Sequence, residues 1–149
     1  MEEINIRKAD VKDFNFIASL SKQMGYEVSI EDVVCRYSYM VNNSNSLLLV
    51  AEENQEVVGW IQSEVHSKLG KYNFAMISGL VVDKNHRNKG IGTELILNTE
   101  KWCNKRGCYG VSLSSGKERK EAHNLYKKLG YINKEKYYFF YKILNKVTR

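Results

Sequence analysis

The sequence predicts a mixed α/β protein, on three observations. Strand-like apolar segments alternate with segments whose apolar residues recur every three or four positions, as on one face of a helix. The segments follow one another as strand, two helices, three strands, helix, strand, helix and one or two final strands. The composition, 43% hydrophobic and 27% charged, is that of an ordinary globular protein. We expect the 149 residues to form a single domain, 1–149.

The first half is predicted to contain one strand and two helices before the sheet begins. Each helix is opened by a capping signal, Asp10 with Asp13 for the first and Ser29 with Asp32 for the second. The expected elements are a strand at 4–7, a helix running to Ser21, a break at 24–26, a helix running to Val41, a polar loop at 42–46, and strands at 47–52 and 57–65 forming a hairpin.

The second half is punctuated by glycines, since the chain contains no proline. Glycine at the end of a helix accommodates the left-handed conformation that stops it. The expected elements are a buried strand at 74–82, a helix from about Gly90 to Gly107, a strand at 109–114, a helix from Glu118 to Leu129 stopped by Gly130, and two strands within 131–143 that meet near 133–135.

The charge is divided unevenly along the chain. The net charge is +6, but residues 1–83 carry −5 and residues 84–149 carry +11. Polyanionic ligands are therefore expected near the second half. No apolar run is long enough for a membrane span, and the N-terminus lacks the apolar region of a secretory signal. The three cysteines have neither zinc-site nor disulfide spacing, so we expect reduced thiols, no bound metal and a cytoplasmic location.

The strongest local signal is a strand that passes through a polar turn directly into a helix, at 80–93. Gly90 and Gly92 allow close approach of a ligand to the backbone, and the free amides of the first helical turn favour an anion. Arg87 and Lys89 add positive charge there. The segment matches neither a P-loop nor a dinucleotide-binding turn, and glycines at such a junction also serve tight packing. A phosphorylated ligand is the prediction.

Two motifs resemble those of the GCN5-related N-acetyltransferase (GNAT) family. The first is Arg87-x-x-Gly90-x-Gly92 after a strand ending Leu80-Val-Val, and the second is the late-helix pattern Tyr126-x-x-x-Gly130-Tyr131. The resemblance covers the order of elements along the whole chain. It implies a single domain with a central mixed, mostly antiparallel sheet flanked by about four helices. It also implies an acetyl-CoA-dependent transferase that acylates a primary amine.

The resemblance further implies which residues hold acetyl-CoA. The backbone of the strand would bind the pantetheine arm, the amides of the glycine turn would bind the pyrophosphate, and basic side chains would meet the 3′-phosphate. The residues so assigned are Leu80, Val81, Val82, Arg87, Asn88, Lys89, Gly90, Ile91, Gly92, Thr93, Arg119 and His123, with Lys117 and Lys127 as further phosphate candidates. Arg119 stands where many relatives have asparagine, and His123 has a second interpretation as a helix-surface histidine.

Acylation of an amine needs a base for the amine proton and an acid for the departing thiolate. By the resemblance Tyr126 is the acid, although its helical face also fits an ordinary core aromatic. The base is an open question, because the strand at 74–82 lacks the carboxylate of many relatives. Glu64 is the candidate base, with His66 as a weaker one, and both also fit solvated strand-end residues.

The acceptor is expected beside the break between the first two helices, as in the family. Tyr26 and Glu27 are the candidate substrate residues. The acids nearby suit a cationic amine such as a polyamine, an aminoglycoside-like amine or a lysine side chain, although Glu31 and Asp32 also fit ordinary helix-start acids. Two rival classes are a catalytically silent acyl-CoA sensor and a nucleic-acid-binding module, the latter disfavoured by the absence of any recognisable signature. The aromatic run 137–141 fits a covered strand or a homodimer contact.

Overall fold

The computed structural model describes residues 3–67, 69–70, 72–136 and 138–145. These residues belong to two compact units, Met1–Ser114 and Ser115–Arg149. The prediction that residues 1–149 form one domain stays a prediction.

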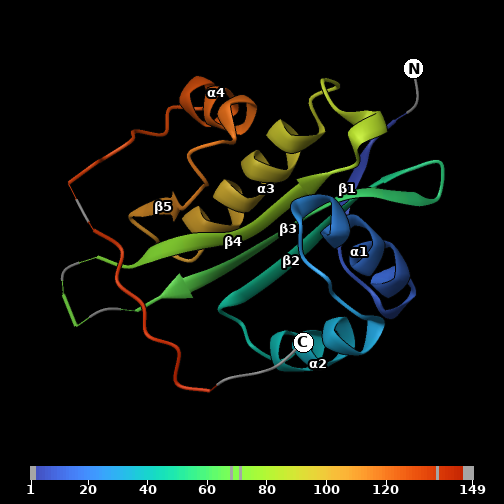
Figure 1. Ribbon diagram of the computed structural model, residues 1–149, viewed down its shortest axis with the longest axis horizontal. Helices are drawn as coiled ribbons and strands as arrows, with labels where there is room; N and C mark the ends of the chain where they lie inside the picture. The colour runs from blue at the N-terminus through green and yellow to red at the C-terminus, as the bar shows by residue number, and fades with distance from the viewer. Residues whose placement is uncertain (1–2, 68, 71, 137, 146–149) are drawn as a thin grey trace. The chain divides into compact units, whose positions relative to one another are not determined.

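The first unit is built on a five-stranded sheet with the strands in sequence order (Figure 1). The first four strands pair antiparallel, and only β4 and β5 run parallel. A parallel pair needs a crossover connection, which α3 supplies. The strands are β1 (Asn5–Lys8), β2 (Ser46–Glu53), β3 (Glu56–His66), β4 (Phe74–Val82) and β5 (Gly110–Leu113).

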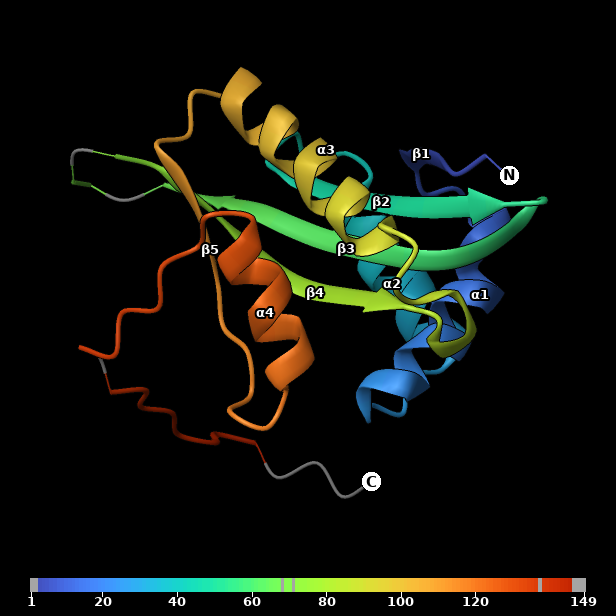
Figure 2. The same ribbon diagram turned by 90° about the horizontal axis from the view of Figure 1, so that it is seen from above.

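Helices cover both faces of this sheet (Figures 1 and 2). One face carries α1 (Phe14–Ser21), which contacts β3, and α2 (Ile30–Met40), which contacts β2. The other face carries α3 (Ile91–Lys105), which contacts all five strands. Three short 3-10 turns, Val11–Asp13, Lys22–Met24 and Lys84–His86, connect these elements. The predicted order of helices and strands through residue 114 is therefore correct.

The capping signals act as the sequence predicts. Ser29 accepts the amide of Asp32 at 3.0 Å, and the Asp32 carboxylate accepts the amide of Ser29 at 2.9 Å. The Asp13 carboxylate likewise accepts the amide of Asp10 at 2.7 Å. Asp32 thus belongs to the capping box at the N-terminus of α2.

The core on the α1 and α2 face is formed by apolar side chains of both helices and of β2, β3 and β4. Its buried members are Phe14, Ile17, Ala18, Leu20, Val33, Val50, Val57, Trp60 and Val81. A carboxylate cluster lies beside this core: Arg7 donates two hydrogen bonds of 2.8 Å to Asp13 and one of 2.7 Å to Glu52. The salt bridges tie β1 to β2 and to the start of α1, because Asp13 directly precedes that helix.

The second unit contains α4 (Lys120–Lys128), which begins two residues later than predicted. A turn precedes α4, in which the amide of Arg119 donates to the carbonyl of Gly116. Gly130, in the left-handed conformation with φ of 91°, follows the end of α4. No described residue of 131–145 is in a strand, so the prediction of two strands within 131–143 is wrong there; residue 137 lies outside the described part. A strand exists only where a neighbour pairs with its backbone, and alternating aromatics do not provide one. Tyr138 and Phe140 are each 88% exposed.

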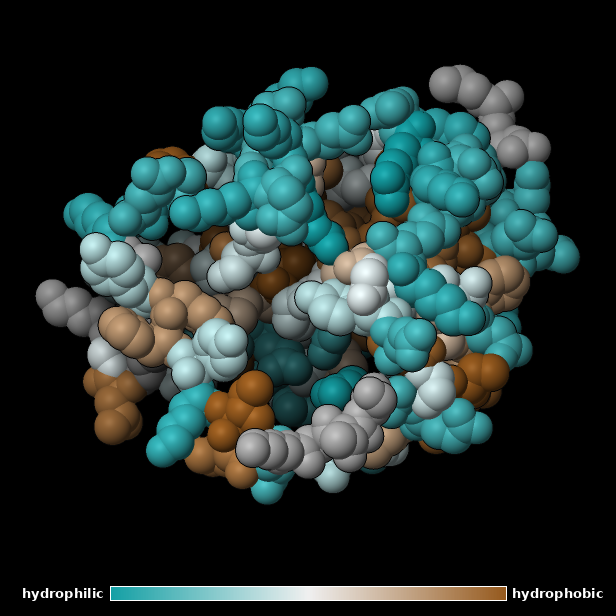
Figure 3. Space-filling model, viewed as in Figure 1, coloured by the Kyte–Doolittle hydropathy of each residue, from teal (hydrophilic) through white to brown (hydrophobic). Residues whose placement is uncertain are grey.

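Hydrophilic side chains cover much of the face seen in Figure 3, and apolar ones appear between them and along its lower border. Among the described residues no helix is both long enough and apolar enough to cross a membrane.

Candidate functional site

The candidate site begins at β4, whose two edges differ along its length. Residues Phe74–Ile77 pair with β3 on one edge and with β5 on the other, but β5 ends opposite Ile77. From Gly79 to Val82 only the β3 edge is paired among the described strands. Predicted cofactor residues Leu80, Val81 and Val82 lie in this stretch, so its second edge is available to an extended ligand.

A β-bulge lies where the second edge of β4 becomes open. Gln62 pairs with Gly79 and Ser63 pairs with Ile77, which leaves Ser78 as the extra residue. Bulges bend a strand and increase its twist, and they are frequent beside functional sites. Gly79 packs against the indole of Trp60 so closely that a Cβ there would lie 2.7 Å from Cζ3 of the ring. The bulge is thus supported from the core side.

The turn after β4 is held in a left-handed conformation at two positions. Asn88 has φ of 64° and Gly90 has φ of 84°. Arg87 donates from Nε to the carbonyl of Val82 at 3.1 Å, which draws this exposed side chain back over the end of β4. The predicted cofactor residues Arg87, Asn88 and Lys89 are therefore exposed together on one turn.

The turn leads directly into the N-terminus of α3. The first intrahelical hydrogen bond runs from the amide of Glu94 to the carbonyl of Gly90 at 3.0 Å. The amides of Ile91, Gly92 and Thr93 precede that bond and have no acceptor within the helix. The side chain of Ile91 is buried and packs over Gly59 of β3, which anchors the helix start on the sheet. This arrangement favours an anion at the helix start.

Polar side chains that the sequence did not single out support this turn. Asp83 accepts from Gln23 Nε2 at 2.9 Å, and Lys84 donates its amide to Gln23 Oε1 at 2.9 Å. His86 contacts Asp83 and also Glu53, which is nearly buried at the end of β2. Lys89 also approaches Glu53, with Nζ 3.9 Å from Oε1. No local spacing signal connects residues 23, 53 and 83.

The candidate base Glu64 lies on β3, opposite Met76 of β4. Side chains two residues apart on a strand share a face, so Glu64 is on the face of Gln62 and Trp60, the face that α1 and α2 cover. Gln62 Nε2 is 3.7 Å from the sulfur of Met40 in α2. Glu64 is half-buried, whereas His66 is exposed at the end of β3. Of the two candidate bases, Glu64 is therefore the less exposed to solvent.

The candidate acceptor residues Tyr26 and Glu27 lie in the connection between α1 and α2. Gly25 turns the chain there with φ of 88°, and Tyr26 is 59% exposed. Glu27 is exposed as well.

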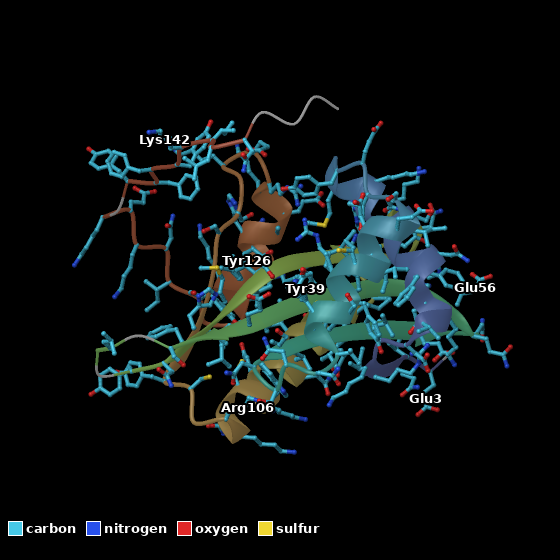
Figure 4. The ribbon with its side chains drawn as sticks, turned by 90° about the horizontal axis from the view of Figure 1, so that it is seen from below. Glu3, Tyr39, Glu56, Arg106, Tyr126 and Lys142 are labelled. Carbon is cyan, nitrogen blue, oxygen red and sulfur yellow. The ribbon has the colours of Figure 1, made fainter. Side chains whose placement is uncertain are left out.

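The second unit places His123 and Tyr126 on α4 and Arg119 directly before it. His123 donates its amide to the carbonyl of Arg119, and Tyr131 donates its amide to the carbonyl of Tyr126 at 3.0 Å. Tyr126, labelled on α4 in Figure 4, is half-buried. Burial raises the pKa of its phenol above the usual value, and the positive charge of Arg119 opposes that shift. The phenol therefore keeps its proton at neutral pH.

The family assignment follows from comparison with known sequences. The sequence model described as the acetyltransferase (GNAT) family matches residues 14–131, which include the β4 edge, the left-handed turn and Tyr126. The chain belongs to the GNAT acetyltransferase family. The acyltransferase family predicted from the two motifs is therefore confirmed.

Curated relatives of this GNAT chain are themselves named N-acetyltransferases. An uncharacterised N-acetyltransferase of Methanocaldococcus jannaschii is 33% identical over 101 residues, 66% of this chain and 45% of the relative. N-alpha-acetyltransferase 30 of Xenopus laevis is 27% identical over 127 residues, 84% of this chain and 46% of the relative. The chain thus spans less than half the length of these two relatives.

Solved structures confirm the predicted fold class for the GNAT chain. An aminoglycoside N-acetyltransferase in complex with CoA has a TM-score of 0.85 at 16% identity, covering 95% of this chain and 96% of its own. Glucosamine-6-phosphate N-acetyltransferase of Arabidopsis thaliana has a TM-score of 0.81 at 23% identity, covering 97% and 100%. At these identities the likeness concerns the fold.

Proposed function

We propose that this chain is an acetyl-CoA-dependent N-acetyltransferase that passes an acetyl group directly to a primary amine of a small, cationic acceptor. The observation that carries the proposal is the continuity of the open β4 edge with the left-handed turn and the unpaired amides of α3. An extended arm and a pyrophosphate joined to it fit these two features in succession.

The residues present fit the cofactor. The backbone of Leu80–Val82 would bond the pantetheine arm as an additional strand does, and the amides from Arg87 to Thr93 would hold the pyrophosphate. The positive charge of residues 84–149 suits the remaining phosphate, for which Lys89, Lys117, Arg119 and Lys127 are candidates. A solved structure of this fold, at 16% identity, is a complex with CoA.

Bound acetyl-CoA would supply an acetyl thioester, whose carbonyl carbon is the electrophile that the amine attacks. As the new C–N bond forms and the C–S bond breaks, one proton must leave the amine and one must reach the sulfur. Tyr126 holds a phenolic proton for the sulfur, in keeping with its raised pKa. Glu64 would take the amine proton, directly or through a water. Transfer then proceeds with no acylated side chain.

The acceptor side favours a cation. Glu64 on β3 and Glu27 after α1 are the candidate carboxylates, and Tyr26 precedes Glu27 in the chain, whereas Asp32 is engaged in capping α2. Proteins of this fold include aminoglycoside and amino-sugar acetyltransferases, and curated relatives include N-alpha-acetyltransferases. These names suggest three amines to be tried: an aminoglycoside, an amino-sugar phosphate and a peptide with a free N-terminus. A polyamine is added because it is a small cation.

The test is a thiol-release assay with acetyl-CoA across that panel. We expect turnover with one of the small cationic amines and not with the peptide. Tyr126→Phe should lower kcat by about 100-fold or more, with little change in KM, because a general acid acts on the chemical step. Tyr109→Phe is the matched control, since Tyr109 is exposed and stacks on Tyr72 at a distance of 4.2 Å between ring centroids.

Other outcomes would select the rival functions. CoA binding in calorimetry without thiol release from any amine would favour an acyl-CoA sensor. Salt-dependent binding of DNA or RNA with no binding of CoA would favour a nucleic-acid-binding module. Unchanged turnover in Tyr126→Phe would remove Tyr126 from the acid role.

A cytoplasmic location is part of the proposal. All three cysteines, Cys35, Cys103 and Cys108, are free thiols in the structure, which suits a reducing compartment.

A further inference from the structure

A nearly buried carboxylate lies beneath the turn that would hold the pyrophosphate. Glu53, at the end of β2, is 6% exposed. Its carboxylate is 3.2 Å from His86 Nε2 and 3.9 Å from Lys89 Nζ, both on the turn between β4 and α3. A carboxylate removed from water needs charged or hydrogen-bonding partners. Of these two partners, His86 is the closer.

His86 connects Glu53 to a second carboxylate. Its Nδ1 is 2.8 Å from Asp83 Oδ2, while its Nε2 faces Glu53. Each nitrogen of the imidazole therefore faces a different carboxylate. The ring bridges the end of β2 and the start of the turn by these two contacts. Lys89 is the charged group that also faces Glu53.

The bridge is itself fixed to the rest of the unit at Asp83. The Asp83 amide donates to the carbonyl of Val58 at 2.8 Å, and its carboxylate accepts from Gln23 Nε2. The amide of His86 donates to the carbonyl of Asp83 at 2.8 Å. Both the backbone and the side chain of His86 are thus held, two residues before the left-handed Asn88.

We propose that His86, held between Glu53 and Asp83, is a positioning residue that keeps the 83–90 turn in its phosphate-binding conformation. The inference rests on the proposed function, since it assigns the pyrophosphate to this turn. His86 does not need to touch the ligand. Without the bridge, the turn samples other conformations, and binding must then restore the competent one at a cost in affinity.

The first experiment measures CoA binding to the purified protein by calorimetry, with no acceptor present. His86→Phe keeps the ring volume and removes both contacts, and Glu53→Gln keeps the side-chain volume and removes the charge. Each should raise the Kd by about tenfold, as expected when the turn loses one polar contact that holds it in place. The double variant should lose little more than either single one, because both remove the same bridge.

The control variant is Glu56→Gln. Glu56 pairs with Glu53 across the β2–β3 turn but is exposed (Figure 4). Its Kd should equal that of the wild type. Thermal unfolding without CoA is measured on every variant, so that a loss of affinity is compared only among folded proteins.

The second experiment separates positioning of the turn from a general loss of structure. With S-acetylpantetheine, a donor that lacks the phosphates, KM should be the same in His86→Phe and the wild type. With acetyl-CoA, KM should rise while kcat at saturation stays within about twofold. Equal loss with both donors, or a Kd for CoA within twofold of wild type in both single variants, would overturn the inference. Absence of CoA binding by the wild type would instead overturn the proposed function.

Discussion

Replacing Gly79 by alanine is expected to destabilise the protein, because the added methyl group enters space that Trp60 already fills. An ideal Cβ at position 79 lies 2.7 Å from Cζ3 and 2.8 Å from Cη2 of the indole. The ring must therefore retreat by roughly 0.7 Å to reach ordinary contact at 3.4 Å. Trp60 is only 8% exposed and belongs to the core under α1 and α2, so it has little room to move.

The size of this effect follows from the cost of overpacking. Adding a methylene to a well-packed core costs about 1–3 kcal/mol in free energy of unfolding. For a chain of this length each kcal/mol lowers Tm by about 2–4 °C, so the expected decrease is roughly 2–12 °C. The measurement is thermal and urea unfolding of Gly79→Ala beside the wild type.

Two controls make the test specific. Gly70→Ala should leave Tm unchanged, because a Cβ there meets no atom within 4 Å. Trp60→Phe removes the two indole atoms that a Cβ at 79 would meet, so the cost of Gly79→Ala should fall by at least about 1 kcal/mol in that background. A Gly79→Ala protein as stable as the wild type, or one with the same cost in both backgrounds, would refute the steric reasoning.

Three further predictions concern stability and reactivity. Asp13→Asn should lower the free energy of unfolding by about 1.5–3 kcal/mol in urea titration, because Arg7 loses its bidentate carboxylate partner and keeps only Glu52. Burial alone would raise the pKa of Asp13, but the Arg7 hydrogen bonds lower it overall. The Asp13 carboxylate therefore stabilises the fold above its unfolded pKa of about 4, and this stabilisation is lost as the pH falls through the lower folded pKa. Asp13→Asn should flatten the decrease in stability at acid pH, and an unchanged decrease would contradict this. Burial raises the pKa of Cys103 to about 12, so mass spectrometry after brief alkylation at neutral pH should find label on exposed Cys35 and not on Cys103; equal labelling would be the contrary result. Ser29→Ala should cost about 1 kcal/mol by removal of the α2 N-cap, whereas Ser29→Asp should restore it.

Local sequence signals predicted those features whose interactions are local. The reciprocal cap of Ser29 and Asp32 involves residues three apart, and the structure shows both of its hydrogen bonds. Gly90 and Gly130 likewise have positive φ at the start of α3 and the end of α4, where a side chain is disfavoured. Such signals need no knowledge of the rest of the fold.

The prediction of strands at 131–143 failed because a strand depends on a partner elsewhere in the chain. The alternation of aromatics there satisfies the sequence pattern of a strand, but a strand also requires a neighbour with matching hydrogen bonds. None of the described residues of that segment has one, and Phe139 is 86% exposed. Pattern alone does not supply the partner.

The sequence by itself determined the family, the order of elements up to α4 and the glycine turn, because each depends on residues close together in the chain. Only the tertiary structure decided how that turn is supported. Glu53 and His86 are separated by 32 intervening residues, and they meet because β2 and β4 both border β3 and end on the same side of the sheet. Contacts of this kind arise from strand pairing, so no local spacing predicts them.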